Sequence, residues 1–261
     1  MNQFCLFALL IGMFSSNFAL AAGVIESASG QVRAGVSAAA ASAVVLKQRI
    51  AAGTTLITGP QSRVTIRFDD GQAIVLNENS EFRVAEYSFT RDQPSKDRYG
   101  FELIKGALRS VTGPLTRRTP RAYALRTPTA TMGIRGTDFM VAIVNPVYLR
   151  VLTGSIEITN SACSGTLDAG YAAVVANAST CAVTISLSAL PAPIAATFSE
   201  LAGLVVLVDG ATLGAALATD AAEGALTMPM AIGIAGAIAA GIAAAAGRGG
   251  GNNITGTTGT R

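Results

Sequence analysis

The residue types that most enzymes use for acid–base chemistry or metal binding are scarce in this chain. The 261 residues include no histidine, so the usual general base near neutral pH and the commonest metal ligand are both missing. The serine motifs S-x-x-K and G-x-S-x-G are absent as well. The glycine cluster at 247–251 follows an apolar segment instead of opening a helix, unlike a phosphate-binding loop. These observations predict a protein with no catalytic residues, no cofactor and no metal ion.

Two of the three cysteines, Cys163 and Cys181, are expected to form a disulfide. The third, Cys5, lies in a segment that we expect to be removed on export. An even number of cysteines in an exported chain indicates a disulfide, which here would close a loop of about 19 residues and stabilise the fold by ~3 kcal/mol. The alternative is a pair of metal ligands, but that site would need two further ligands in a chain without histidine.

The adjacent carboxylates Asp69 and Asp70 are interpreted as turn residues. They follow the run at 63–68, in which apolar and polar residues alternate, and they precede Gly71. A carboxylate next to a glycine is the common solution to a hairpin turn. A calcium site or an acid–base pair is the less favoured interpretation.

Residues 1–22 are predicted to be a secretory signal peptide. An uncharged, largely apolar stretch at 4–14 is followed by Ala19, Ala21 and Ala22, which fit a cleavage site after Ala21 or Ala22. The apolar stretch is too short to span a bilayer. The absence of Lys and Arg from its start is atypical, so an uncleaved membrane anchor remains the alternative. The predicted location is the periplasm or the cell surface.

The segment 23–185 is predicted to be mainly β, a roll or β-solenoid of many short strands. Alternating apolar and polar residues are interrupted every 8 to 12 residues by Gly, Pro, Asn or Asp. The runs at 101–108 and 149–156 share one pattern, in which a glycine interrupts an alternating strand. We interpret each as a strand, a sharp glycine corner and a second strand. A stacked coil and a sandwich of unrelated hairpins are both compatible with this pattern.

The C-terminal part is rich in Ala and Gly and is predicted to be helical. Residues 186–196 are interpreted as a linker, 197–247 as a hydrophobic helical hairpin or membrane segment, and 248–261 as a disordered tail. The uncharged stretch 227–247 is long enough to cross a bilayer or to pack as a soluble hairpin on a partner or on itself. The sequence leaves these two interpretations open.

The segment 126–141 resembles the central signature of the FecR domain. The residues that carry the resemblance are Thr127, Pro128, Gly133, Arg135, Gly136, Thr137 and Phe139. The flanking segments resemble the family as well, so that the resemblance runs from about residue 30 to residue 175. The resemblance implies a β-rich module on the outer side of the inner membrane. Regulators of this family also have a segment that acts on a sigma factor; nothing like it precedes the β domain here, so that contact is not carried over.

The spacing of the signature suggests where its side chains lie. Gly133 and Gly136 would let the backbone turn twice within four residues, so that Arg135 projects from a constrained corner. We expect Arg135 to bond loop carbonyls or an acidic neighbour such as Asp138, and so to stabilise the fold. Binding of a ligand or partner by Arg135 is the alternative. Thr137 is not favoured as a nucleophile.

Two functions remain from these observations. The first is an exported, non-catalytic binding or scaffold module of the cell envelope, with an envelope protein or outer-membrane component as partner, and with self-association or membrane association through 227–247. The second, implied by the resemblance, is a periplasmic signalling component that senses a TonB-dependent receptor for iron complexes. A basic stretch at 117–121 suits anionic lipid or polysaccharide, although a solvated loop is the simpler interpretation. No nucleic-acid partner is expected outside the cytoplasm.

Overall fold

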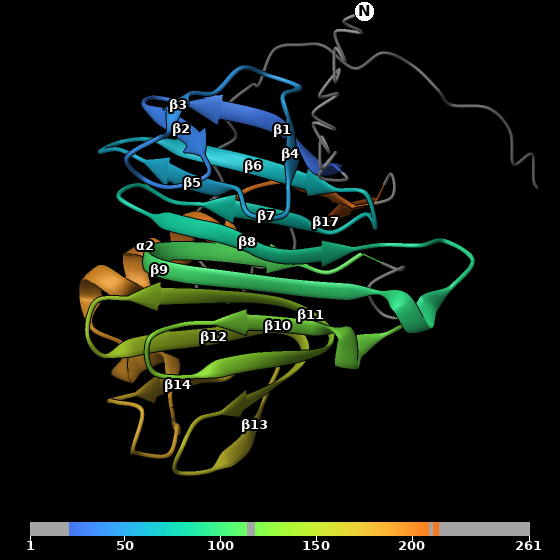
Figure 1. Ribbon diagram of the computed structural model, residues 1–261. Helices are drawn as coiled ribbons and strands as arrows, with labels where there is room; N and C mark the ends of the chain where they lie inside the picture. Colours follow the sequence, from blue (N-terminus) through green and yellow to red (C-terminus); the bar gives the residue numbers. More distant parts are fainter. Residues whose placement is uncertain (1–20, 114–117, 209–210, 214–261) are drawn as a thin grey trace, which may run out of the picture. The chain divides into compact units, whose positions relative to one another are not determined.

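The computed structural model describes residues 21–113, 118–208 and 211–213, and most of these lie in β-strands (Figure 1). The first strands are β1 (Ala21–Ser29), β2 (Val32–Gly35), β3 (Ser42–Ala43), β4 (Arg49–Ala51), β5 (Thr55–Thr58), β6 (Arg63–Phe68), β7 (Ala73–Leu76) and β8 (Glu81–Ser88). Then follow η1 (Pro94–Lys96), β9 (Arg98–Val111), η2 (Pro120–Ala122), β10 (Tyr123–Arg126), β11 (Thr131–Ile143) and β12 (Val147–Thr159). The last elements are β13 (Ser164–Asp168), β14 (Ala172–Val175), β15 (Val183–Ile185), η3 (Leu187–Ala189), α2 (Ala192–Ala202), β16 (Val206–Val208) and β17 (Ala211–Leu213).

The strands β1 to β15 form one mixed sheet, and β16 and β17 form a separate hairpin. The long strand β9 changes neighbours along its length: residues 98–105 pair with β8, whereas residues 106–111 pair with β7 and β11. Strand β12 does the same, pairing with β14 before Gly154 and with β13 after it. The sheet therefore folds into two layers that share their longest strands.

The glycine corners predicted from the sequence are the points where these strands bend. Gly106 in β9 has φ +83° and Gly154 in β12 has φ +74°, a conformation that favours glycine. Each corner lies inside one continuous strand instead of joining two separate strands. The mainly β, roll-like class predicted for this region is thus confirmed, in the form of a single sheet with bent strands.

The hydrophobic core lies between the two layers. In β6 the side chains of Val64, Ile66 and Phe68 are buried, while the residues between them are partly exposed, as the alternation predicts. Aromatic rings continue the core from one strand to the next. The Phe101 ring centroid lies 5.0 Å from that of Phe68 and 5.6 Å from that of Tyr123. Full burial of such side chains contributes roughly 1.5–3 kcal/mol each.

Helix α2 covers the outer face of one layer. Its buried side chains Ile194, Phe198 and Leu201 are spaced along one side of the helix. They pack in a second apolar cluster with residues of β7, β9 and β11. The helix begins inside the segment 186–196 that was predicted as a linker and is followed by β16, where continued helix was expected. Two prolines within 191–193 fit the first turn of a helix, where the missing N–H costs nothing.

The turn between β6 and β7 has the predicted chemistry. Gly71 has φ +86°, and the Asp70 carboxylate accepts hydrogen bonds from the Gln72 N–H at 3.3 Å and the Tyr87 hydroxyl at 3.1 Å. Asp69 forms an ion pair with Arg49 across the neighbouring strand. The turn interpretation of the two carboxylates agrees with these contacts.

The predicted disulfide is confirmed, since Cys163 and Cys181 are bonded with their Cα atoms 5.6 Å apart. No helix in the part of the chain described here is long and apolar enough to cross a membrane. Nor do three acidic or cysteine side chains gather into a metal site within those residues. Three predicted features lie outside the described residues: the signal peptide predicted at 1–22, apart from its last two residues, the segment 227–247 and the tail 248–261.

Two glycine substitutions test the corner in β12. A Cβ on Gly154 would lie 2.3 Å from the carbonyl oxygen of Gly136, and its φ is positive. We expect Gly154→Ala to lower the free energy of unfolding by roughly 2 kcal/mol or more, measured by urea denaturation. The matched control is Gly133→Ala, whose new Cβ would meet nothing closer than 3.9 Å. If the two variants were equally stable, the claim that β12 needs a glycine at its bend would be wrong.

Candidate functional site

The signature begins at the turn between β10 and β11. The Thr127 hydroxyl donates a hydrogen bond to the Ala130 carbonyl at 2.9 Å, and the Ala130 N–H donates one back to the hydroxyl at 3.2 Å. Pro128 is exposed within this turn. A threonine that closes a turn and a proline that fixes the backbone are structural parts, and they set where β11 starts.

The two glycines of the signature play different roles. Gly133 lies in the regular part of β11, paired with Glu157 of β12, whereas Gly136 has φ +67° at a bulge between Arg135 and Asp138. The prediction of two turns within four residues is therefore wrong for Gly133. A strand can continue through a glycine when its neighbours supply the ladder partners, and β10 and β12 do so here. The bulge at Gly136 alone changes the direction of the strand.

Beyond the bulge the signature turns into the protein. Thr137 is buried: its N–H donates to the Thr112 hydroxyl at 2.9 Å, and its carbonyl accepts from that hydroxyl at 2.9 Å. Its own hydroxyl oxygen has no hydrogen-bond partner among the described residues. Phe139 is fully buried, with its ring centroid 6.4 Å from that of Tyr123. Thr137 and Phe139 thus contribute to the core and not to a surface site.

Asp138 forms a buried ion pair with Arg109 of β9. The Arg109 Nε and Nη2 donate to the two carboxylate oxygens at 2.9 and 2.6 Å. The Arg109 Nη1 donates to three carbonyls at the end of α2, those of Leu201, Ala202 and Leu204. Both side chains are almost inaccessible to solvent. The guanidinium therefore joins the signature strand to the C-terminal end of α2 and to the residue Leu204 that follows it.

Arg135 does not bond Asp138, contrary to the expectation from the sequence. Asp138 is already occupied by Arg109, and Arg135 points to the opposite side of β11 from the core. Arg135 is exposed and has no hydrogen bond or ion pair with any described residue. Of the two charged residues within 133–139, Asp138 is paired inside the protein and Arg135 has no partner among the described residues.

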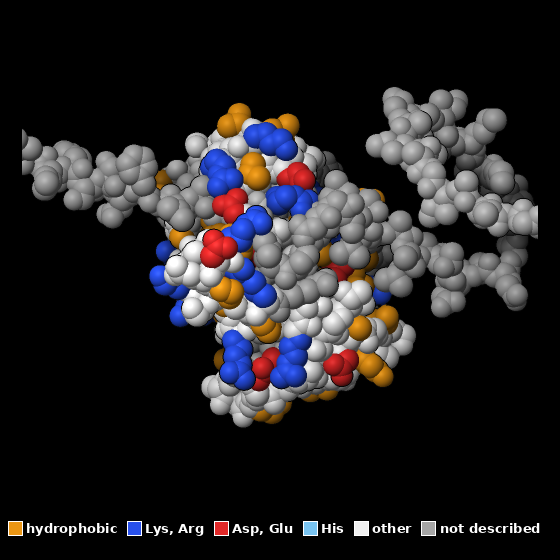
Figure 2. Space-filling model, turned by 90° about the vertical axis from the view of Figure 1, so that its right-hand side faces the viewer, with side chains coloured by type: hydrophobic (Ala, Val, Ile, Leu, Met, Phe, Trp, Pro, Cys, Tyr) orange, Lys and Arg blue, Asp and Glu red, His pale blue; other side chains and the backbone are white. Residues whose placement is uncertain are grey.

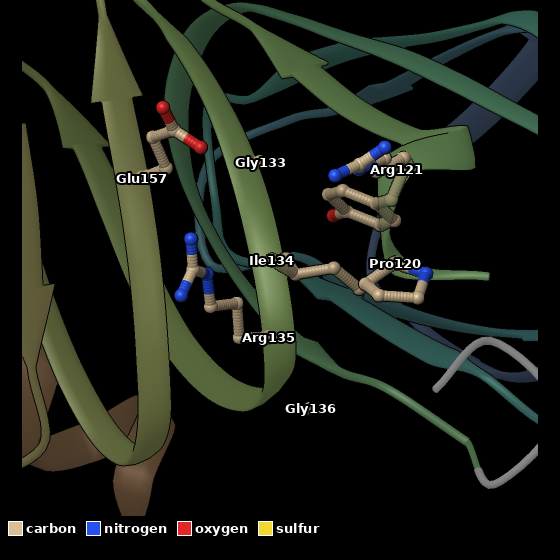
Figure 3. Close-up of a pocket in the computed structure, with 8 residues that line it drawn as sticks. Pro120, Arg121, Gly133, Ile134, Arg135, Gly136 and Glu157 are labelled. Atoms are coloured by element: carbon tan, nitrogen blue, oxygen red, sulfur yellow. The ribbon is translucent and has the colours of Figure 1, made fainter. Parts of the chain in front are cut away.

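A surface depression of about 860 Å³ lies around Arg135. Figure 3 shows Arg135 and Glu157 on the same side of strands β11 and β12, while Ile134 points the other way toward Pro120. Arg121, in η2, lies at the rim on the Ile134 side. Because Gly133, which pairs with Glu157, has no side chain, the backbone of β11 is uncovered next to this carboxylate. The lining of the depression includes two guanidinium groups and one carboxylate, and these groups can form ion pairs with a charged partner.

The base of the depression is held by Tyr123. Its ring is buried and its hydroxyl lies 3.1 Å from the Ser110 hydroxyl. Burial raises the pKa of Tyr123, so the hydroxyl stays protonated at physiological pH. Tyr123 therefore supports the site as an uncharged wall.

A second depression of about 560 Å³ adjoins the first, sharing Pro120 and Arg121 with it. Its loops are organised by Asp97, whose side chain is inaccessible to solvent. The carboxylate accepts hydrogen bonds from the Thr90 N–H, the Arg118 guanidinium and the Thr119 hydroxyl, each within 3.1–3.2 Å. These contacts fix the loop that carries Arg121.

Sequence reasoning missed Arg109, Asp97 and Glu157. The signal for Arg109 was present, because it occupies the face of β9 that also holds the buried Ala107 and Val111. A charge on an otherwise apolar face indicates a buried partner. For Asp97 and Glu157 the sequence offers no such pattern, since both depend on residues far along the chain.

Similarity to known proteins supports the resemblance noted from the sequence. A family model described as FecR protein matches residues 54–157. Two solved structures of a candidate anti-sigma factor from Parabacteroides distasonis ATCC 8503, at 1.65 and 2.50 Å resolution, are each 18% identical, with TM-scores of 0.41 and 0.42. The similarity covers 51% of this chain and 59% of theirs, so this chain spans less than two thirds of their length. No curated protein is a significant match.

The pH dependence of stability tests the Asp97 cluster. Burial by itself would raise the pKa of Asp97, but hydrogen bonds from Thr90, Arg118 and Thr119 outweigh it and lower the pKa below its usual value. Because the folded pKa is depressed, the stabilisation is complete above the ordinary value of about 4 and is lost as the pH falls through the lowered pKa. Asp97→Asn should remove this contribution.

The measurement is the free energy of unfolding of both proteins across the acid range. We expect the difference between the original protein and Asp97→Asn to be largest near neutral pH and to shrink below about pH 4. Asp92→Asn, an exposed change in the same loop, serves as the control. If the difference in the free energy of unfolding between the two proteins did not vary with pH, the charge of Asp97 would not contribute to stability.

Proposed function

From the FecR domain that the chain contains, matched over residues 54–157, we propose an exported, non-catalytic protein of the bacterial cell envelope that binds a partner at the face around Arg135. The observation that carries the proposal is the division within the signature. Thr127, Gly136, Thr137 and Phe139 act within the fold. Within 133–139, Arg135 is the residue that combines a charge, exposure and no hydrogen bond or ion pair with a described residue.

The chemistry of this face favours a protein partner. A guanidinium presents a planar fork that binds a carboxylate through two parallel hydrogen bonds. Glu157, two residues along the neighbouring strand from the residue that faces Arg135, offers an acceptor for a basic group. A surface that holds a positive and a negative side chain at a fixed spacing favours a partner whose charged groups have the opposite signs at the same spacing. Figure 2 shows that Lys and Arg lie among Asp and Glu elsewhere on the molecule too, so specificity comes from this arrangement and not from net charge.

Two further observations support export and lack of catalysis. The disulfide between Cys163 and Cys181 is typical of proteins folded in an oxidising compartment. The buried carboxylates Asp97 and Asp138 are ion-paired, and Asp70 is hydrogen-bonded in its turn. A carboxylate held in this way is a poor general acid or base, and the chain has no histidine to replace it.

A role as a sensor in envelope signalling is the second candidate, and the FecR domain favours it. This candidate uses the same face, with an outer-membrane receptor as the partner. The identity of whatever binds near Arg135 therefore separates a sensor from a scaffold component.

The test places a photo-crosslinking amino acid at position 159, which is exposed on the same side of β12 as Glu157, in living cells of the source bacterium. We expect an envelope protein to be crosslinked, and we expect Arg135→Gln to weaken the association by about tenfold or more, as for a central charged contact. A crosslinking residue at position 183, exposed on β15, is the control and should not capture the same protein. A crosslink that persists in Arg135→Gln, or a chain that fractionates with the cytoplasm, would refute the proposal.

A further inference from the structure

The end of the sheet formed by β2, β3 and the turn before β4 exposes apolar side chains. Val36, Val45 and Leu46, which we call the apolar tip, are 79%, 68% and 63% exposed. These are the highest values among the large hydrophobic residues described. Alanines at 38–40 lie exposed in the same segment. Figure 2 shows apolar and basic side chains together at this upper end of the molecule.

The backbone holds the apolar tip outward. The Val45 N–H donates to the Gln48 side-chain oxygen at 3.0 Å, and the Gln48 N–H donates to the Val45 carbonyl at 3.1 Å. The Lys47 N–H donates to the carbonyl of Ile25 in β1 at 2.9 Å. This turn is tied at both ends, so Val45 and Leu46 do not reach the core. Ordered apolar side chains in water are unfavourable for a soluble surface and mark an interaction site.

Charge on this part of the chain has a single sign. Residues 27–68 contain five Lys and Arg and no Asp or Glu. Three of the five are ion-paired with acidic residues outside the segment: Arg49 with Asp69, Arg63 with Glu200, and Arg67 with Glu26. Arg33 and Lys47 remain exposed, with no ion pair among the described residues, and both flank the apolar tip.

A shallow depression of about 470 Å³ lies next to the tip. It is lined by Ala28, Val32, Val44, Leu46 and Arg33, together with Gly30, Gln31 and Ala43. Its lining is mainly apolar, with one guanidinium. Apolar side chains that project beyond basic ones match the layering of a bilayer surface, where acyl chains lie below anionic headgroups.

We propose that the apolar tip inserts into the surface of a bilayer containing anionic phospholipids, with Arg33 and Lys47 binding the headgroups. A stable protein interface buries about 800 Å² on each side with close shape complementarity, whereas the apolar tip consists of three large apolar side chains next to a few alanines. A lipid surface needs no such complementarity, only apolar depth and positive charge. The apolar tip shares no residue with the face around Arg135, so membrane binding by the tip does not depend on partner binding at that face.

The absence of tryptophan from the chain permits a local probe. In the full-length protein, Leu46→Trp introduces a single reporter at the tip. We expect its emission to shift to shorter wavelength with vesicles of phosphatidylglycerol and phosphatidylcholine, and not with phosphatidylcholine alone. Val144→Trp, at a residue 57% exposed between β11 and β12, is the control for binding by any other segment and should not shift.

Charge removal provides the second measurement. In the Leu46→Trp protein, Arg33→Gln with Lys47→Gln should weaken vesicle binding by roughly thirtyfold, since each of the two cations near an anionic surface contributes about five- to sixfold. Arg83→Gln, which removes an exposed charge outside the apolar tip and outside the Arg135 face, should leave binding unchanged. No shift of the tip reporter with anionic vesicles would overturn the proposal. A shift of the tryptophan emission on raising the protein concentration without vesicles would also overturn it, because a second copy of the chain would then be the occupant of the tip. If the double variant bound anionic vesicles with unchanged affinity, Arg33 and Lys47 would not be part of the site.

Discussion

The arrangement of this domain depends on one buried ion pair, Arg109 with Asp138. The guanidinium binds both carboxylate oxygens and three carbonyls at the end of α2, so one side chain connects β9, β11 and the helix. Burying two charges is costly, and the cost is offset only when every donor and acceptor finds a partner. Here the helix end provides the remaining acceptors. The pair therefore specifies that α2 lies across the outer face of one layer.

This pair also explains why Arg135 is free. The bulge at Gly136 turns Asp138 inward to Arg109, while Arg135 stays on the outer side of the strand. The signature is one continuous motif in the sequence, but the two residues between Arg135 and Asp138 separate an internal part from an external part. The internal part stabilises the fold, and the external part provides the charged face that we assign to partner binding.

The sequence predicted the local features of this fold well. Alternation in β6 identified the buried residues Val64, Ile66 and Phe68, and the glycine pattern identified the corners at Gly106 and Gly154. What it did not predict depends on long-range contacts. The residues near Asp138 in the sequence do not indicate that its partner is Arg109. Likewise, the segment 186–196 does not indicate that a helix packs on one face of the sheet. The interpretation of Arg135 as a structural residue failed for the same reason, since Asp138 was already paired.

The measurement that tests this account most directly compares the stability of two charge-neutralised variants from the same signature. Urea unfolding should show that Asp138→Asn lowers the free energy of unfolding by roughly 3–5 kcal/mol, because it leaves the Arg109 charge buried without its partner. Arg135→Gln should change it by no more than about 0.5 kcal/mol, as expected for an exposed residue. If Arg135→Gln destabilised the protein as much as Asp138→Asn does, Arg135 would belong to the fold and the proposed division would be wrong.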